Sequence, residues 1–432
     1  MKTIIIGGGI SGLAAAYHLK NDYIIFEKEN TAGGLCRSIK TGGFTFDYSG
    51  HFLHLRNDYS KNLVFSLLGK NINSISRNSC IYSNKAFTKY PFQANLFGLP
   101  DKVVQECISG LIQAKNTLKN QGPLKRNITF HDWILRTFGK GFAKHFFFPY
   151  NEKLWTVNTK ALTTDWIDIF IPQPSLKEVI DGAYSDQKKA FGYNASFYYP
   201  EKGGIQSLID SIKSKTQNLR LNSPVSKVDA ENKYVTSNGL QIKYDNLIST
   251  MPLPELLTSI VNLPKEIISA KNKLLWTSVD CVNIGVKHKN LKKGVHWIYF
   301  PEKEFAFYRT GFYHNFTKKA VPDKCSSMYV EVSYKPDKKP SRVSIIKKVI
   351  LGLRRSGIID DKCTILKTQV LSMPYAYVIY DKNRTKALET INSFLKKKNI
   401  YSIGRYGAWK YSYIEESILD AKATAELILK NE

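Results

Sequence analysis

Three glycines near the amino terminus constrain the fold more than any other feature of the sequence. Gly7, Gly9 and Gly12 follow a short apolar run at residues 2–6 and precede a helix-forming run. This spacing predicts a strand, a tight turn made at the first glycine, and a helix that packs closely on the strand at the third. The second glycine lets a pyrophosphate approach the backbone, and the helix amino terminus, with Ser11 in its first turn, faces the anion. A dinucleotide is therefore the expected ligand.

An acidic residue and a second glycine pair narrow the choice of dinucleotide. A second apolar strand ends in Glu27, twenty positions after Gly7, where a carboxylate can accept hydrogen bonds from a ribose diol. Gly33 and Gly34 follow, and then Arg37. This arrangement resembles the flavoprotein class of amine oxidases and their relatives, and NAD dehydrogenases lack it. FAD is therefore the expected cofactor, with Gly34 near the flavin-side phosphate and Arg37 supplying charge.

Two later segments resemble further parts of the same cofactor fold. Val225 lies in a segment that resembles the strand whose backbone contacts adenine. Gly404 and Arg405 belong to a segment that resembles the strand-to-helix turn beside the flavin. We therefore expect a discontinuous FAD-binding domain made of residues 1–70, 198–270 and 370–432.

The segments between these pieces predict two further domains. Residues 95–197 carry apolar side chains at helical spacing and are expected to form a helical substrate domain. Residues 71–94 and 271–369 are expected to form an antiparallel-sheet substrate domain, because residues 281–286, 297–300 and 327–332 alternate like strands. The expected fold class is α/β, a Rossmann-like FAD-binding domain with a helical insertion domain and this sheet domain.

Two helix ends are predicted within the helical domain. Gly139 directly follows an amphipathic stretch at residues 129–138 and predicts a helix stop. A helix should also end before Pro149, because the residue before a proline avoids the α conformation, and a new helix should start at the proline. In that new helix Asn151 and Trp155 share one face at positions i and i+4.

Composition restricts the class of protein. The 432 residues carry a net charge of +27, which suits an anionic partner such as nucleic acid, an acidic lipid or a nucleotide. The lysines are scattered and no nucleic-acid-binding motif accompanies them, so solvated basic faces are favoured and no nucleic-acid partner is expected. The six cysteines form no CxxC pair, which argues against a metal site and fits reduced thiols in the cytoplasm. No transmembrane segment is expected, because no run approaches roughly 20 apolar residues, although surface attachment stays open.

Motifs spread over the whole chain are shared with one known family. They are FDYSGH at 46–51, YPFQAN at 90–95, PYNEKLW at 149–155, YNASF at 193–197, GGI at 203–205, FYR at 307–309 and GRYGAWKY at 404–411. In this order they resemble UDP-galactopyranose mutases, nearest the eukaryotic type. The second and third motifs are the specific signal, because other flavin oxidases share only the first fifty and the last thirty residues.

The resemblance implies an isomerase. These mutases interconvert the pyranose and furanose forms of UDP-galactose or a related nucleotide-linked sugar without net redox change. Reduced flavin N5 attacks the anomeric carbon and expels the nucleotide diphosphate. The protein holds the anomeric carbon over N5 and stabilises the leaving diphosphate. The resemblance further implies NADPH or another electron donor and a cytoplasmic role in galactofuranose supply for surface polysaccharide synthesis.

The resemblance also assigns roles to individual residues. His51 resembles a histidine of a mobile loop beside the flavin, and Arg309 resembles an arginine that grips the diphosphate. Tyr375 and Tyr411 resemble phosphate-contacting tyrosines and complete the expected catalytic group. The residues expected to hold uridine are Tyr90, Gln93, Phe146, Asn151 and Trp155. Asn194 and Trp297 are expected near the sugar and Arg77 on the flavin side, with core packing or solvation as the alternative role for aromatic and arginine side chains.

Three positions depart from the family pattern. Phe170 stands where the family has a second diphosphate-gripping arginine, and Phe316 stands where it has a tyrosine. Glu415 replaces part of an asparagine-containing stretch and would repel a diphosphate unless it points away or meets a sugar hydroxyl. Loss of a clamp arginine would weaken transition-state stabilisation by several kcal/mol. A different nucleotide sugar, or a substrate without a diphosphate, therefore stays open.

Two other hypotheses fit the sequence. A flavin-dependent oxidase or desaturase on the same scaffold would act on a sugar, an amine or another small molecule and turn over an electron acceptor. A catalytically silent protein of a glycan pathway would bind FAD for stability alone. The sequence does not decide the oligomeric state, and an oligomer is allowed.

Overall fold

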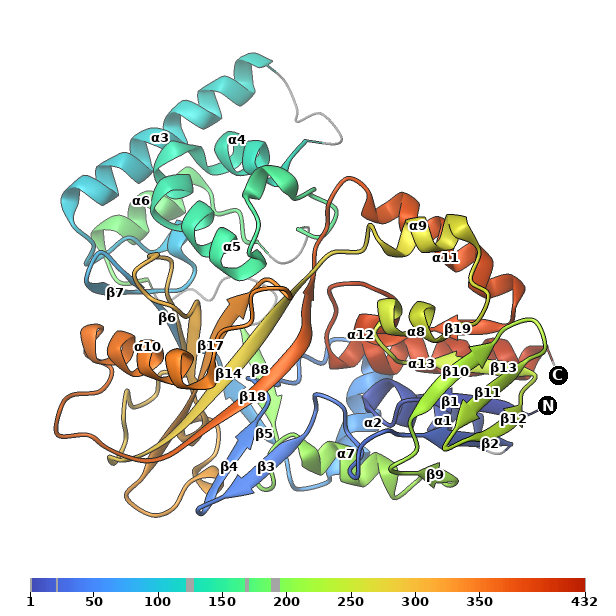
Figure 1. Ribbon diagram of the computed structural model, residues 1–432. Coiled ribbons are helices and arrows are strands. Elements are labelled where there is room, and N and C mark those ends of the chain that lie inside the picture. Colours follow the sequence, from blue (N-terminus) through green and yellow to red (C-terminus); the bar gives the residue numbers. More distant parts are fainter. Residues whose placement is uncertain (1, 21, 122–127, 168–170, 188–194, 432) are drawn as a thin grey trace.

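The structure, a computed structural model, describes residues 2–20, 22–121, 128–167, 171–187 and 195–431. Its elements form three regions: a parallel sheet with helices, a large mixed sheet, and a group of helices (Figure 1). The predicted α/β fold class is confirmed. Two of the predicted site positions, Phe170 and Asn194, lie outside the described residues, and the exact domain boundaries stay a prediction.

A five-stranded parallel sheet forms the region that contains both ends of the chain (Figure 1). Its strand order is β19-β13-β1-β2-β9, and every neighbouring pair runs parallel. The strands are β1 (Thr3–Ile6), β2 (Tyr23–Phe26), β9 (Leu219–Arg220), β13 (Asn246–Ser249) and β19 (Ile400–Ser402). Because these strands come from the start, the middle and the end of the chain, the region is discontinuous in sequence.

Helices cover both faces of this sheet, which explains why β1 is an uninterrupted apolar run. Ile5 packs in one cluster with α1 and α13, whereas Ile4 and Ile6 pack in another with α8 and α11. The helices are α1 (Ile10–Leu19), α2 (Asp58–Leu68), α7 (Gln206–Lys213), α8 (Leu253–Ser259), α9 (Lys265–Lys271), α11 (Arg384–Lys397), α12 (Gly404–Gly407) and α13 (Ile414–Lys430). A three-stranded antiparallel sheet, β10 (Val225–Asp229), β11 (Tyr234–Ser237) and β12 (Leu240–Lys243), packs on the second face.

The second sheet has seven strands in the order β18-β14-β17-β16-β15-β6-β7. It is antiparallel except where β15 pairs with β6. The strands are β6 (Ser79–Ser83), β7 (Ala86–Lys89), β14 (Trp276–Lys287), β15 (Trp297–Tyr299), β16 (Arg309–Phe312), β17 (Ser326–Tyr334) and β18 (Thr364–Val378). The strands predicted at 281–286, 297–300 and 327–332 therefore coincide with β14, β15 and β17.

Both faces of this sheet are also covered. Val282 and Ile284 of β14 pack in one cluster beneath α10 (Arg342–Arg355), and Val279 and Cys281 pack in another on the opposite face. The second cluster includes residues of β4 (Phe44–Asp47), which pairs with β3 (Ser38–Thr41), and of β8 (Ser196–Tyr199), which pairs with β5 (Asn73–Ser76). This second face, which carries Val279, lines the large cleft of the molecule.

The third region is helical, as predicted. Its elements are α3 (Asp101–Gln121), α4 (Phe130–Phe142), a π-helical turn (Ala143–Phe147), α5 (Phe148–Trp155) and α6 (Leu176–Tyr184). Gly139 breaks the helical backbone with φ of 80° inside α4, so the predicted stop is a kink rather than an end. A β-carbon at Gly139 would lie 2.0 Å from the carbonyl oxygen of Gly110, which shows how closely α3 and α4 cross there.

The predicted interruption at Pro149 is only partly correct. A new helix does begin there, but Phe148 adopts α conformation and the backbone stays helical through the junction. Pro149 lies in the first turn of α5, where a backbone N–H would have no intrahelical partner, so its missing donor costs little. The wider π-helical turn just before it absorbs the change of hydrogen-bond pattern. Trp155 donates its indole N–H to Asn151 Oδ1 at 3.3 Å, as the predicted shared face requires.

Glu415 points away from the region where a diphosphate was expected. Its Oε1 accepts hydrogen bonds from the backbone N–H of Arg56 at 2.7 Å, that of Asn57 at 2.8 Å and the hydroxyl of Ser60 at 2.7 Å. The carboxylate is buried and joins the first turn of α13 to the amino terminus of α2. The concern that this carboxylate repels a bound anion is therefore removed.

The helices of the described ranges include none with the length and apolarity of a bilayer-spanning segment. All six cysteines are described, and each is a free thiol.

We predict that replacing Glu415 with alanine destabilises the protein by about 2–4 kcal/mol, because three donors, among them the buried hydroxyl of Ser60, lose a buried carboxylate acceptor. Urea unfolding of the purified protein measures this loss. Glu426→Ala on the same helix is the matched control, because Glu426 is exposed and pairs only with Lys422 across one helical turn. Equal stability of the Glu415 variant and the wild type would contradict the assigned contacts.

Candidate functional site

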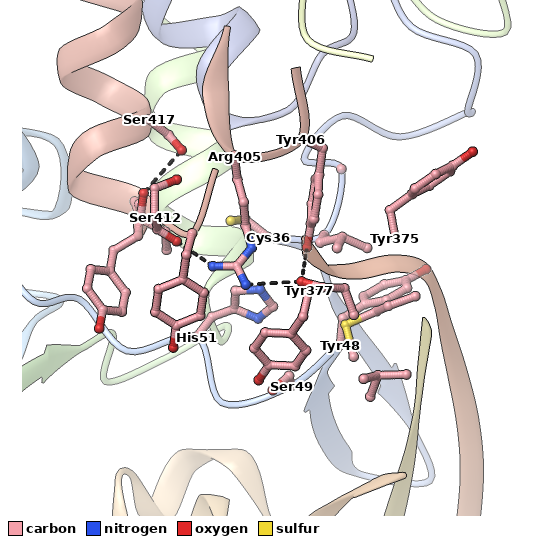
Figure 2. Close-up of a pocket in the computed structure, with 18 of the residues that line it drawn as sticks. Cys36, Tyr48, Ser49, His51, Tyr375, Tyr377, Arg405, Tyr406, Ser412 and Ser417 are labelled. Carbon is pink, nitrogen blue, oxygen red and sulfur yellow. Dashed lines mark hydrogen bonds between the residues drawn. The ribbon is translucent and has the colours of Figure 1, made fainter. Parts of the chain in front are cut away.

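One cleft of about 800 Å³ runs from the carboxyl ends of the parallel strands to the seven-stranded sheet and α5. Its two ends differ in chemistry. Glycines and acidic side chains line the end at β1 and β2, and tyrosines and arginines line the end against the large sheet. Figure 2 shows part of the second end, where side chains from the loop after β4, from β18 and from α12 converge. The cleft thus joins the two sites that the sequence predicts.

The glycine turn has the geometry of a phosphate cradle. A β-carbon on Gly12 would lie 1.9 Å from the carbonyl oxygen of Gly7, so α1 packs on β1 at a distance that no side chain allows. A β-carbon on Gly9 would meet no described atom nearer than 3.8 Å, and Gly9 lines the cleft. The first turn of α1 begins without a side-chain cap, so its N–H groups face the cleft free for an anion. This turn fits the pyrophosphate of a dinucleotide.

Glu27 and Arg37 flank the cradle. Glu27 is buried, and its carboxylate accepts hydrogen bonds from the N–H of Gly8 at 2.7 Å and of Glu29 at 2.9 Å. Arg37 donates to the carbonyl oxygen of Gly34 at 2.8 Å and to the hydroxyl of Tyr48 at 3.0 Å. Both side chains also line the cleft, so each retains hydrogen-bonding capacity toward a ligand. Ser11, Val225 and Gly404 complete the predicted cofactor-contacting set along the same wall.

Arg405 brings a buried positive charge into the middle of the cleft. Its guanidinium donates to the carbonyl oxygens of Ser412 and Ala376 and lies 4.9 Å from the ring centre of Tyr411 and 5.4 Å from that of Tyr377 (Figure 2). Among the described residues no carboxylate lies within ion-pair distance of it. A buried cation balanced only by carbonyl and phenol dipoles favours an anion in the adjacent space.

His51 faces the same space from below Arg405 in the view of Figure 2. Its Nδ1 is buried and has no hydrogen-bond partner among the described residues. Burial lowers the pKa of His51 to about 4, so the imidazole is neutral at physiological pH. A neutral ring with an open nitrogen can donate to or accept from a ligand placed above it.

Arg309 is held by a carboxylate that sequence reasoning missed. Glu331, directly opposite on β17, accepts two hydrogen bonds from the Arg309 guanidinium and a third from the Ser49 hydroxyl. Glu331 is 1% exposed and interrupts an otherwise apolar strand, MYVEV. A carboxylate in a strand buried on both faces needs a cationic partner, so the sequence could have marked Glu331 as paired, although not with which cation. The Arg309 guanidinium therefore lines the cleft in a fixed orientation, with its charge balanced by Glu331.

The predicted uridine pocket is largely assembled. Tyr90, Gln93, Phe146 and Asn151 line the cleft, with the rings of Phe146 and Tyr150 stacked 5.2 Å apart. Trp155 does not line it. This side chain is buried behind Asn151, between Trp166 at 5.0 Å and Tyr377 at 5.5 Å. Its contact with uridine therefore finds no support here, and we read it as a positioning residue for Asn151.

Arg77 also lies outside the cleft lining. Its guanidinium stacks on the ring of Tyr90 at 4.6 Å and so supports that ring from behind. Trp297 does line the cleft, and its indole N–H is buried with no acceptor among the described residues. Phe316 packs beneath, 4.9 Å from the ring of Phe52, and adds no polar group to the cleft.

Two tyrosines of β18, Tyr375 and Tyr377, line the cleft, and only Tyr375 was predicted to contact phosphate. Tyr375 lies on the cleft rim against Trp276, 4.9 Å away, and points away from Arg405 (Figure 2). Tyr377 points inward, and its hydroxyl lies 3.2 Å from that of Tyr308, the residue before Arg309. Tyr377 is thus the better placed of the two to meet an anion at Arg309, and the sequence resemblance did not single it out. Tyr411 lines the cleft as predicted.

Lys153 ties the helical wall to the sheet wall. It follows Asn151 on α5, and its ammonium donates to the carbonyl oxygens of Phe300 at 2.8 Å and Phe307 at 3.2 Å, and also to that of Glu302. These carbonyls belong to the segment that leads into Arg309. The contact therefore fixes the distance between the predicted nucleotide-binding and phosphate-binding walls.

Comparison with known proteins agrees with this geometry. The family model of flavin-containing amine oxidoreductases matches residues 10–429. The crystal structure of a reduced UDP-galactopyranose mutase superposes with a TM-score of 0.93 at 28% identity, covering 100% of this chain and 96% of that one. A putative protoporphyrinogen oxidase from Exiguobacterium sp. 255-15 superposes at 0.78 with 16% identity, covering 100% and 99%, and shares the fold.

A curated relative matches only locally. The 4,4'-diapophytoene desaturase of Staphylococcus aureus (strain MRSA252) is 39% identical over 74 residues, which are 16% of this chain and 14% of that protein. The chain thus spans a small part of the curated relatives that it matches. The predicted resemblance to UDP-galactopyranose mutases and the predicted FAD cofactor are confirmed by the whole-chain matches. The roles of individual site residues stay predictions.

We predict that Gly9→Ala and Gly12→Ala fail in different ways. The methyl group of an alanine at position 9 clashes with no atom of the described residues but occupies space expected for the pyrophosphate. This variant should therefore fold but bind FAD at least tenfold more weakly. The alanine at position 12 collides with the Gly7 carbonyl, so the protein itself is destabilised by several kcal/mol. Flavin absorbance per protein and thermal unfolding, measured on both variants, separate the outcomes. Unchanged flavin content in the folded Gly9 variant would refute the cradle.

We also predict a pH effect at His51. Between about pH 4 and 6.5 the unfolded chain binds a proton here that the folded protein does not, so stability falls as the pH is lowered through this window. His51→Gln should therefore lose about 2 kcal/mol less than the wild type between pH 7 and pH 5. Urea unfolding of the FAD-loaded proteins measures the difference. His54 and His296, whose pKa values burial also lowers to about 4, are present in both proteins and cancel.

Proposed function

The chain belongs to the flavin-containing amine oxidoreductase family, and from that premise we propose that it is an FAD-dependent nucleotide-sugar mutase. It is a flavoenzyme by family and fold. The proposed substrate is UDP-galactopyranose or a close relative, converted to its furanose form in the cytoplasm for surface polysaccharide synthesis. NADPH or another reductant would keep the flavin reduced.

The observation that carries this proposal is the continuity of the cleft. The glycine cradle, His51, Arg309 and the predicted uridine residues Gln93 and Asn151 all line the same cavity. A nucleotide sugar bound along it can reach both a resident flavin and the aromatic wall of α5. The TM-score of 0.93 to a mutase over the whole chain, including the helical region, supports the same proposal.

Gln93 has a defined orientation that suits a nucleobase. Its Nε2 donates to the carbonyl oxygen of Pro172 at 2.7 Å, and because a carbonyl only accepts, the amide cannot be reversed. Its Oε1 is thereby left as an acceptor, and Gln93 lines the cleft. An acceptor there matches a base with a ring N–H donor, as uracil has.

Arg309 can grip a diphosphate while it stays paired with Glu331. The pair uses Nε and Nη2, and a guanidinium has five N–H donors, so about three remain for phosphate oxygens. Glu331 fixes the orientation of these donors in advance, which favours stabilisation of charge that develops as the diphosphate leaves. Phe170, which stands where the family has a second diphosphate-gripping arginine, lies outside the described residues.

Bound reduced flavin supplies the nucleophile for the anomeric carbon. The residues of this chain bind and orient the sugar, and Tyr377 and Tyr411 donate hydroxyls to phosphate oxygens. The cleft is also lined by aromatic rings that exclude water: Tyr90, Tyr150 and Tyr308. The neutral His51 ring can hold a hydrogen bond at its open Nδ1 without adding charge.

A flavin-dependent oxidase or desaturase is the second candidate. The local match to a desaturase and the buried, apolar Phe316 favour it. Such an enzyme would need no diphosphate grip. It would take two electrons from its substrate and pass them to an acceptor in every turnover, whereas a mutase leaves the oxidation state of the flavin unchanged over the cycle.

We predict that the dithionite-reduced, FAD-loaded protein converts UDP-galactopyranose to the furanose under anaerobic conditions, as seen by chromatography. Arg309→Ala should lower kcat by about 10²–10³-fold, because it removes phosphate donors used as the bond breaks. Tyr377→Phe should lower activity more than Tyr375→Phe, which serves as the matched control on the same strand. Absence of furanose together with acceptor-dependent oxidation of the flavin by a sugar or amine would favour the oxidase instead.

A further inference from the structure

The outward face of α10 combines cations with exposed apolar side chains. Val343 is 78% exposed and Leu351 is 49% exposed, although both are large apolar residues. Lys347 lies midway between them at i+4 spacing, so the three share one stripe on the side away from the protein. The opposite stripe packs against the sheet through Ile345, Val349 and Leu353. The exposed stripe is therefore not needed for packing.

Positive charge is concentrated on this helix and its flanks. Residues 335–362 contain nine lysine and arginine residues and three aspartates, a net charge of +6. This is roughly a fifth of the net charge of the chain in about a fifteenth of its length, which exceeds what a uniformly lysine-rich composition gives. Five of the cations are on the helix itself, which carries no acid: Arg342, Lys347, Lys348, Arg354 and Arg355, all exposed.

The position of the helix leaves the cleft accessible. α10 covers the face of the seven-stranded sheet where Val282 and Ile284 lie, and the cleft opens on the other face, at Val279. In Figure 1 the helix lies at the outer edge of the sheet region, away from the region that holds the chain ends. A partner bound to α10 would not cover the site.

We propose that the outward face of α10 docks the protein on an anionic lipid bilayer. Cations on one helical face attract acidic headgroups, and apolar side chains between them enter the boundary of the acyl region. Nucleic acid would use the same charge but would gain nothing from Val343 and Leu351. This combination favours a bilayer over a polyanion and identifies the partner as a membrane surface rich in acidic lipid.

The test is co-sedimentation of the full-length, FAD-loaded protein with phosphatidylcholine vesicles, with and without phosphatidylglycerol. Binding is expected only with phosphatidylglycerol, and raised salt should weaken it. Lys347→Glu/Lys348→Glu should weaken binding at least about tenfold. The matched control is Lys396→Glu/Lys397→Glu in the exposed last turn of α11. It changes the net charge of the protein by the same amount and should retain binding.

A second pair of variants separates a bilayer from a polyanion. Val343→Ser/Leu351→Ser should weaken vesicle binding several-fold and leave retention on heparin unchanged, because only the bilayer uses the apolar side chains. The proposal is overturned if anionic vesicles do not bind the wild type, if the α11 control loses as much binding as the α10 variant, or if the serine variant binds vesicles as well as the wild type. Circular dichroism and flavin content of each variant confirm that the protein as a whole remains folded.

Discussion

The close approach of α1 to β1 is the constraint on which the rest of the structure depends. With the Gly7 carbonyl 1.9 Å from where a Gly12 β-carbon would lie, the helix can lie this close to the turn only because position 12 has no side chain. This close approach aims the amino terminus of α1 into the cleft and sets where a pyrophosphate sits. An FAD held at this turn would extend along the cleft, which His51 and Arg405 also line. The chemical roles proposed for Arg309 and the tyrosines of the large sheet depend on where the cofactor lies relative to them.

The sequence predicted the cofactor end well, because backbone geometry dictates its residues. A turn that admits phosphate requires glycine at Gly9, and close packing requires it at Gly12, so the pattern carries its own physical reason. The junction at Pro149 was harder. Local preference predicts a break after Phe148, but the π-helical turn before it keeps the chain helical, and no single residue signals such a turn.

The substrate end was less predictable, because it depends on contacts between distant segments. The sequence suggested that Glu415 would repel a phosphate. Its carboxylate instead accepts a hydrogen bond from the hydroxyl of Ser60 on α2, 355 residues away in sequence. Tyr375 and Tyr377 lie two apart on one strand, and only the approach of Tyr308 distinguishes them. The pairing of Arg309 with Glu331 follows from the register of β16 on β17, which strand patterns alone do not give.

The charge balance of the cleft then limits the chemistry. Arg309 and Glu331 cancel at long range, so the pair contributes direction through hydrogen bonds more than it contributes net attraction. Arg405, by contrast, is held by carbonyl and phenol groups, and its charge acts on whatever enters between the two walls. Under the proposed function, an anion in the cleft would be drawn toward Arg405 and oriented by Arg309. On that proposal, Arg405 attracts the anion, and Arg309, whose orientation Glu331 fixes, orients it. The proposed grip on a phosphate then does not depend on the arginine that the family has where Phe170 stands.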